Sequence, residues 1–259
     1  MLRKKARKLK SLLKEHSLYL KSRKKKDVKF IIFAQGRSGS TLLMDLFNSH
    51  PGIYCDGEIF GAQISHNVFN KYLYIKTKSE VVQEPVYGCK IKIYDLTKYQ
   101  NMGFEKAKQF IHQLYKEGWK IIYLKRHNIY RQALSSLIAE ERKTYHFFKN
   151  ENHKNDLISI QDVESIIWRM ELLEEFTKQE EALLSEIEFK KVNYEDDLLN
   201  QSKHHTVMAE LFSFIGVDTV DVDTKYSRTS SDDLSQTISN YGSFVNMLKG
   251  TRFETYLDV

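Results

Sequence analysis

Cysteine and proline are scarce in this sequence of 259 residues, which has two of each. Two cysteines, Cys55 and Cys89, are too few for a disulfide framework, and no cluster of cysteine and histidine predicts a metal site. No stretch rich in proline, glycine or serine forms a linker, and no segment repeats. A single domain is therefore expected, since 41% hydrophobic and 12% aromatic residues are enough to build one buried core.

Long apolar runs are also missing from the sequence. No segment reaches the roughly eighteen apolar residues of a membrane-spanning helix. The N-terminus lacks the apolar centre of a secretion signal. These absences predict a cytoplasmic protein, either soluble or bound to the inner face of the membrane.

Positive charge is concentrated in the first part of the chain. The net charge is +6, but residues 1–26 contain twelve of the 40 lysines and arginines and one of the 34 acids, which leaves 28 and 33 in residues 27–259. Apolar residues at helical spacing suit a basic amphipathic helix on an anionic membrane. A solvated extension without fixed structure is the alternative. No nucleic-acid partner is expected, because the segment lacks a series of aromatic residues between the basic ones.

Strand-like and helix-like segments alternate along residues 27–259. Apolar runs predict strands at residues 28–34, 87–93, 119–125 and 188–193. Amphipathic patterns predict helices from about residue 128 to 151 and from about 159 to 186. This alternation is typical of a parallel sheet covered by helices.

The most informative stretch is Gln-Gly-Arg-Ser-Gly-Ser-Thr, residues 35–41, between the first strand and a helix-like run. Backbone N–H groups of such a turn and of the first helical turn converge on one point, where the helix dipole favours an anion. The pattern predicts a phosphate-binding loop with six contributing residues: Gly36, Arg37, Ser38, Gly39, Ser40 and Thr41. A simple turn with a serine or threonine helix cap is the alternative.

The loop differs from that of nucleoside triphosphatases. Their loop is Gly-x-x-x-x-Gly-Lys followed by serine or threonine. Here Gly36 and Gly39 are three residues apart, and no lysine precedes Ser40. A P-loop kinase nevertheless stays as one alternative function, and a non-catalytic protein that binds polyanions or membranes is the other.

A second strand-to-helix junction follows about ninety residues later. The strand at residues 119–125 ends in Arg126, Asn128 is expected to cap the next helix, and Ser135 lies about two turns into it. In a parallel sheet both junctions lie at the edge where the strands end and where ligands bind. Arginine suits a phosphate there, because its planar group donates two hydrogen bonds to one anion.

Together these motifs resemble the sulfotransferases that use 3′-phosphoadenosine 5′-phosphosulfate (PAPS). Residues 37–43, Arg-Ser-Gly-Ser-Thr-Leu-Leu, are similar to their 5′-phosphosulfate loop, and Arg126 with Ser135 to their 3′-phosphate element. Tyr-Glu-Asp-Asp-Leu at residues 194–198 and a helix end at Gly216 are also similar to this family. The resemblance covers residues 28–257 and implies a P-loop-like α/β sandwich of three layers, with PAPS as donor and no metal. We therefore expect a sulfotransferase domain at residues 27–259.

Residues 50–58, His-Pro-Gly-Ile-Tyr-Cys-Asp-Gly-Glu, resemble the branch that acts on carbohydrates, in particular nodulation-factor and, more loosely, trehalose sulfotransferases. The resemblance implies Glu58 as general base, with His66 in reserve, because a sugar hydroxyl attacks only as its proton is removed. Arg37 would stabilise charge on the departing phosphate. The implied acceptor is a hydroxyl of a carbohydrate or glycolipid. A surface glutamate that caps a helix is the alternative for Glu58.

Two further features are candidates for the rim of the site. Lys90 and Lys92 lie on the predicted strand at residues 87–93, where solvated lysines are also common. A polar basic loop, residues 225–230, is placed to close over the nucleotide.

Overall fold

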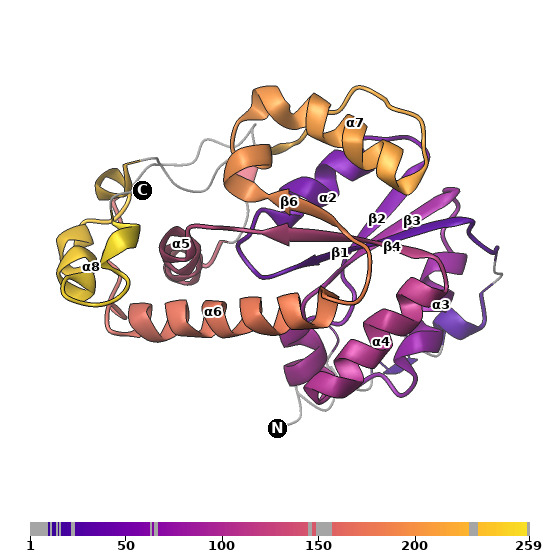
Figure 1. The fold of residues 1–259 in the computed structure, drawn as a ribbon, viewed down its shortest axis with the longest axis horizontal. Helices are drawn as coiled ribbons and strands as arrows, with labels where there is room; N and C mark the ends of the chain where they lie inside the picture. The colour runs from indigo at the N-terminus through magenta and orange to yellow at the C-terminus, as the bar shows by residue number, and fades with distance from the viewer. Residues whose placement is uncertain are drawn as a thin grey trace.

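The centre of the fold is a five-stranded parallel sheet with strand order β2-β3-β1-β4-β6 (Figure 1). The structure is a computed structural model that describes residues 10, 12–13, 15, 17–21, 24–62, 64, 67–144, 147–148, 157–227 and 233–257. The five strands are, in chain order, Val28–Ala34, Ile53–Glu58, Val86–Ile91, Trp119–Lys125 and Lys190–Asn193. The parallel sheet expected from the sequence is confirmed.

Helices connect the strands and cover both faces of the sheet (Figure 1). The α-helices α2 to α8 are Ser40–Asn48, Lys71–Glu80, Phe104–Lys116, Ile129–Arg142, Ser165–Leu184, His204–Ile215 and Tyr241–Leu248. Two π-helical turns, Asp95–Tyr99 (η1) and Tyr194–Leu198 (η2), follow β3 and β6. Short 3₁₀ turns are Gln201–Lys203, Leu234–Gln236 and Glu254–Tyr256, and a small antiparallel pair joins β5 (Phe147–Phe148) to β7 (Tyr226–Ser227).

Successive side chains of β1 point to opposite faces of the sheet, and helices packed against each face give the fold its three layers. Phe30 and Ile32 pack toward α2 and α7 on one face, whereas Ile31 and Phe33 pack toward α3 and α4 on the other. All four side chains are fully buried, because β1 is the central strand and each of its faces is covered by helices. The expected three-layer α/β sandwich is therefore what the structure shows.

A third group of buried residues lies beyond the edge where the strands end. It joins α5, α6 and α8, which lie side by side on the left of Figure 1, through residues such as Leu134, Met170 and Phe244. This packing fixes α5, the helix that follows β4. The position of α5 matters because it carries one of the predicted phosphate contacts.

The structure differs from the prediction at several elements, and the helix expected from about residue 159 begins only at Ser165. β2 was not predicted, because Ile53–Glu58 is an edge strand with only two buried side chains and with polar residues and a glycine in its second half. The helix predicted to run to residue 151 ends at Arg142, where Lys143 adopts a left-handed conformation with φ of 54°. Such a residue ends a helix in the same way as a glycine cap.

The described end of the basic segment contacts the domain. Leu18 packs against the core formed with α3 and α4. The Lys26 amine, in a residue that is 3% exposed, donates a 2.8 Å hydrogen bond to the Val82 carbonyl, and burial lowers its pKa. Among the described residues, no helix is both long enough and apolar enough to cross a membrane.

Candidate functional site

A cavity of about 870 Å³ opens at the edge of the sheet where the strands end. It lies at the junctions that the sequence motifs mark. Its walls include all but one of the predicted site residues: Gly36, Arg37, Gly39, Ser40, Thr41, Glu58, Arg126 and Ser135. The exception is Ser38, which is 1% exposed and whose hydroxyl donates a 2.8 Å hydrogen bond to the Gln35 carbonyl. Its side chain closes the turn instead of facing the cavity.

The loop after β1 depends on an unusual backbone. Arg37 and Gly39 have positive φ angles of 60° and 91°. A Cβ atom on Gly39 would also lie 2.4 Å from Cδ2 of Tyr194, closer than side chains allow. Glycine is therefore required at this position for two independent reasons.

The start of α2 faces the cavity without a side-chain cap. Gly39 occupies the cap position and no side chain accepts a hydrogen bond there, so the alternative of a serine or threonine cap is wrong. Ser40 and Thr41, the first two helical residues, line the cavity. Their N–H groups belong to the first turn, which has no intrahelical acceptors and carries the positive end of the helix dipole. This geometry suits an anion.

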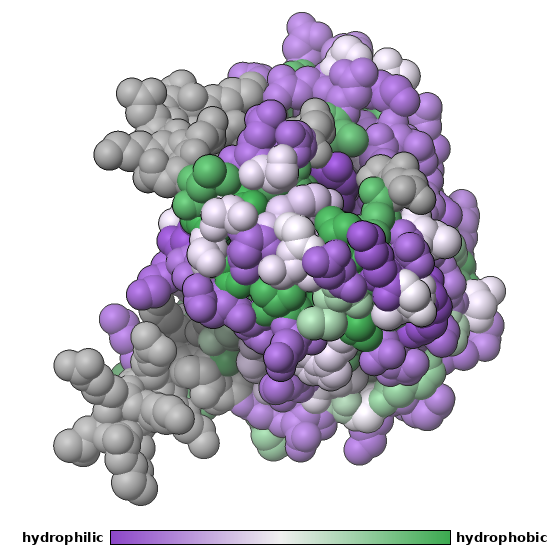
Figure 2. Space-filling view, turned by 90° about the vertical axis from the view of Figure 1, so that its left-hand side faces the viewer, coloured by the Kyte–Doolittle hydropathy of each residue, from purple (hydrophilic) through white to green (hydrophobic). Residues whose placement is uncertain are grey.

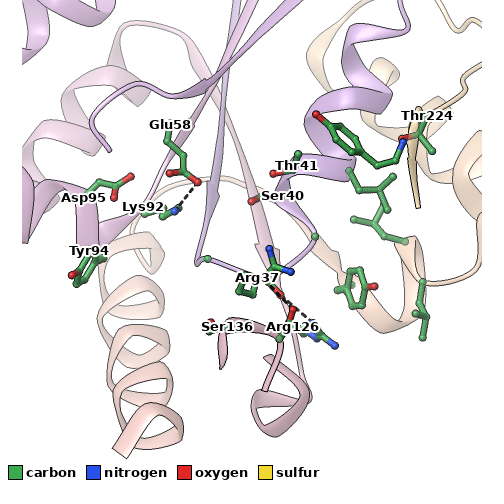
Figure 3. Close-up of a pocket in the computed structure, with 18 of the residues that line it drawn as sticks. Arg37, Ser40, Thr41, Glu58, Lys92, Tyr94, Asp95, Arg126, Ser136 and Thr224 are labelled. Carbon is green, nitrogen blue, oxygen red and sulfur yellow. Dashed lines mark hydrogen bonds and ion pairs between the residues drawn. The ribbon is translucent and has the colours of Figure 1, made fainter. Parts of the chain in front are cut away.

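The second junction meets the first, because β4 pairs with β1. An Arg126 guanidinium nitrogen donates a 3.1 Å hydrogen bond to the Arg37 carbonyl (Figure 3). Arg37 Nε donates a 3.0 Å bond to the Ser135 hydroxyl. Asn128 Oδ1 accepts from the Arg131 backbone, which confirms the predicted helix cap. Arg37 from the loop after β1, Arg126 from the end of β4 and Ser135 from α5 thus surround one region of the cavity.

Groups beneath Arg126 hold it in place. Its guanidinium lies 4.7 Å from the centre of the Tyr194 ring, and its Nε lies 3.6 Å from Glu195. Glu195 also accepts hydrogen bonds from the backbones of His127 and Asn128, at 2.9 and 3.1 Å. Glu195 therefore has a structural role, since it links Arg126 to the start of α5.

Glu58 lies at the end of β2, on the other side of the loop (Figure 3). Its Oε1 is 2.6 Å from the Lys92 amine and 3.7 Å from the Lys90 amine. A register shift between Asp56 and Glu58 places Glu58 opposite Lys90, as bulges near functional sites often do. Lys90 in turn donates a 3.1 Å hydrogen bond to the Thr41 hydroxyl, so Lys90 connects Glu58 with the phosphate loop through one ion pair and one hydrogen bond.

Burial shifts the pKa values of two charged groups near Glu58 in opposite directions. Lys90 is 5% exposed, and desolvation lowers its pKa while Glu58 acts in the opposite direction. Asp95 is 2% exposed, and desolvation raises its pKa to about 6 against the influence of Lys92. Asp95, Tyr94 and Tyr99 line the cavity but carry no motif. The one feature of the sequence that could have indicated Asp95 is its position as a polar residue shortly after the buried strand β3.

A buried network anchors the start of the loop. The Gln35 amide nitrogen donates to the Thr177 hydroxyl and to Glu180 Oε2, both at 3.0 Å, and the Tyr123 hydroxyl donates to Glu180 at 3.2 Å. Desolvation raises the pKa of Glu180 to about 7. From α5, the Gln132 amide donates a 2.7 Å bond to the Gly36 carbonyl. These contacts hold the loop between α5 and α6.

The last part of the wall comes from the segment before β7. The Thr224 hydroxyl donates a 2.8 Å hydrogen bond to Asp45, and the Lys225 amine lies 3.3 Å from the same carboxylate. Thr224 and Tyr226 line the cavity, so this segment is fixed beside α2. Residues 228–230 of the predicted closing loop and the reserve base His66 lie outside the described residues.

Comparisons with known proteins find a similar fold. No protein-family model and no curated protein sequence matches the chain. The structure is similar to that of a sulfotransferase from Alicyclobacillus acidocaldarius, with a TM-score of 0.53 and 15% identity over 90% of this chain and 99% of the other. At this identity the likeness shows a shared fold. A mouse sulfotransferase complexed with PAP (3′-phosphoadenosine 5′-phosphate) aligns with a TM-score of 0.43 and 12% identity, over 92% of this chain and 91% of the other.

Proposed function

We propose that this chain is a sulfotransferase that moves a sulfuryl group from PAPS to a hydroxyl of a carbohydrate or glycolipid. The observation that carries the proposal is the meeting of the two phosphate motifs in one cavity. The uncapped start of α2 lies beside Arg37, Arg126 and Ser135, on a fold shared with a sulfotransferase. The phosphate loop and Arg126 with Ser135 provide for two phosphate groups, whereas a nucleoside triphosphate has a single chain of phosphates.

The residues present fit such a donor. The first turn of α2, with Ser40 and Thr41, would hold the 5′-phosphate, while Arg126 and Ser135 would hold the 3′-phosphate. In this arrangement Arg37 exchanges its hydrogen bond to Ser135 for one to a phosphate oxygen. The phosphate oxygen is charged whereas the Ser135 hydroxyl is neutral, so the guanidinium forms the stronger bond with the phosphate, which favours the exchange.

PAPS supplies the activated sulfuryl group. In the proposed reaction the acceptor oxygen forms a bond to sulfur while the bond from sulfur to the phosphate oxygen breaks. Glu58 accepts the proton of the acceptor hydroxyl. Arg37 and the N–H groups of the loop stabilise the charge that develops on the departing phosphate. Lys92, which is 2.6 Å from Glu58, keeps this carboxylate oriented between the acceptor side and the loop.

Tyr94 and Tyr99 add aromatic rings to the cavity wall, together with the polar side chains of Lys92 and Asp95. Aromatic rings combined with a few polar groups are typical of sites that bind small molecules. On the side of the molecule shown in Figure 2, hydrophilic residues cover much of the described surface, with hydrophobic residues among them.

The direct test is transfer of labelled sulfate from PAPS to a panel of glycans and glycolipids. Product should form with wild-type protein and be greatly reduced in Arg126→Ala, because a charge-assisted phosphate contact is worth about 1.5 to 3 kcal/mol. Transfer to phenols or steroids but to no glycan would contradict the proposed acceptor class. Transfer to no hydroxyl acceptor at all would contradict the proposed activity.

A further inference from the structure

Asp95 is a buried carboxylate in the cavity wall for which the proposed reaction has no role. It is the first residue of η1, immediately behind β3. The residue is 2% exposed and lines the cavity, and its Oδ2 has no hydrogen-bond partner among the residues that the structure describes. Such an atom destabilises the folded chain unless a ligand or a water molecule completes its hydrogen bond.

The groups around Asp95 are charged but balanced. Figure 3 shows its carboxylate on the side that faces Glu58 and Lys92. Asp95, Glu58, Lys92 and Lys90 together form a group of two carboxylates and two lysines. The charges of the other three residues all affect the pKa of Asp95. An anionic group on the acceptor would therefore meet two carboxylates without a net positive charge. An uncharged donor of hydrogen bonds would meet none of this repulsion.

Two tyrosine rings flank the same position. Tyr94 and Tyr99 line the cavity at either end of η1, and their ring centres are 5.5 Å apart in an edge-to-face arrangement. A tyrosine presents both an apolar face and a polar hydroxyl. A molecule with C–H and O–H groups on neighbouring positions, such as a sugar ring, fits this combination of surfaces.

We infer that Asp95 binds the acceptor: Oδ2 accepts a hydrogen bond from a hydroxyl or N–H group adjacent to the hydroxyl that receives the sulfuryl group. The inference rests on the proposed function and narrows its acceptor. The preferred substrate class is an uncharged polyol or sugar with a second hydrogen-bond donor next to the reacting oxygen. Sugars with a carboxylate or sulfate at that position are disfavoured.

The ionisation of Asp95 adds a dependence on pH. Burial and Glu58 raise the pKa of this carboxyl to about 6, while Lys92 and Lys90 act against the rise. The neighbouring Tyr99 has a raised pKa and stays neutral at these pH values. Below pH 6 a proton occupies the carboxyl and competes with the acceptor for its oxygens. Acceptor affinity should therefore fall as pH is lowered from 7.5 to 5.

The test uses the full chain saturated with 3′-phosphoadenosine 5′-phosphate (PAP), the desulfated donor product. Binding of methyl α-D-glucopyranoside and of the corresponding glucuronide, which carries a carboxylate, is measured by saturation-transfer NMR titration. Wild type should prefer the glucoside. Asp95→Asn keeps the shape of the side chain but should bind the glucoside on the order of tenfold more weakly and lose the pH dependence. Asp218→Asn, an exposed position outside the cavity, is the matched control and should match wild type.

The PAP-induced rise in melting temperature is recorded for every variant as a check on folding and on the nucleotide site. If Asp95→Asn keeps this rise and binds the glucoside as tightly as the control, the inference is wrong. A wild-type preference for the glucuronide, or equal binding at pH 5 and 7.5, would also overturn it without any variant. Failure of PAP to stabilise the wild type would instead contradict the proposed function, and this inference with it.

Discussion

At the scale of single residues, the site is built from side chains that restrain one another. Arg37 is held by Ser135, Arg126 by the Tyr194 ring and Glu195, and Glu58 by Lys92. Such restraint reduces the conformational freedom that is lost when a ligand binds. It also means that each residue has a distinct expected effect when it is replaced.

Replacement of Glu58 tests its role as proton acceptor. Glu58→Gln keeps the shape of the side chain but removes the basic oxygen, so turnover should fall on the order of a hundredfold or more while PAP still binds. Steady-state rates and PAP-induced melting shifts measure the two effects. Glu188→Gln, at an exposed position away from the cavity, should change neither. Near-normal turnover in Glu58→Gln, with chemistry limiting the rate, would show that another group accepts the proton.

Glu180 makes stability depend on pH. Burial raises its pKa from an ordinary 4.5 to about 7, so the folded state keeps a proton that the unfolded state releases. The free energy of unfolding should therefore fall as pH rises from about 4.5 to about 7, by on the order of 3 kcal/mol, and level off above.

Urea denaturation at pH 5 and pH 8 measures this contribution. Glu180→Gln should remove it and be more stable than wild type at pH 8, because the amide retains an acceptor oxygen without a charge. The neighbouring exposed Glu181→Gln should keep the wild-type dependence. An unchanged difference between the two pH values in Glu180→Gln would show that Glu180 is ionised in the folded state.

At the scale of elements, the sequence predicts those strands and helices that a regular pattern of apolar residues specifies. The bounds of β1 and β4 agree with the structure, because both are mostly apolar segments in the middle of the sheet. β2 was missed because an edge strand tolerates polar residues and glycine. The phosphate loop and Arg126 were predictable from motifs, whereas Asp95 reaches the cavity, and Gln132 the loop, only through tertiary packing. A lone polar residue carries no such information in the sequence.

Glycine at one position in β3 is required by packing. A Cβ on Gly88 would lie 2.2 Å from Cζ of Phe30, in the centre of the sheet. Gly88→Ala should therefore destabilise the protein by about 1 to 3 kcal/mol or more, since a close-packed core has no room to adjust.

Gly242→Ala is the matched control for this prediction. A Cβ there has no heavy atom within 4 Å, and the position is inside α8. This replacement should be neutral or stabilising by roughly 0.5 to 1 kcal/mol, because alanine is the better helix former. Chemical denaturation compares the two variants. Equal stability of both would contradict the packing of Phe30 against β3.

At the scale of the whole molecule, charge divides the chain into two parts. Residues 1–26 hold twelve basic residues and one acid, whereas residues 27–259 hold 28 and 33. The described part of the basic segment contacts the domain through Leu18 and Lys26. We propose that the remaining positive charge attracts the protein to anionic membranes, where a glycolipid acceptor would be found.

Removal of exposed lysines in this segment tests the proposal. Four lysines are replaced by glutamine together: Lys10, Lys21, Lys24 and Lys25. Binding to vesicles with anionic lipid should weaken, by about 1 kcal/mol for each lysine near the surface, and most strongly at low salt. The control replaces four exposed lysines elsewhere, Lys106, Lys116, Lys178 and Lys249, and should bind nearly as wild type does. An equal loss in both variants would point to net charge alone.

The central claim is that the cavity recognises a nucleotide with separate 3′ and 5′ phosphates. The most direct measurement compares the melting temperature of the protein with PAP and with ATP plus Mg²⁺. PAP should raise the melting temperature clearly more than ATP does, and Arg126→Ala should abolish the difference by removing the arginine contact to the 3′-phosphate. Equal stabilisation of the wild type by both nucleotides, or stabilisation by ATP alone, would contradict the account and favour a kinase.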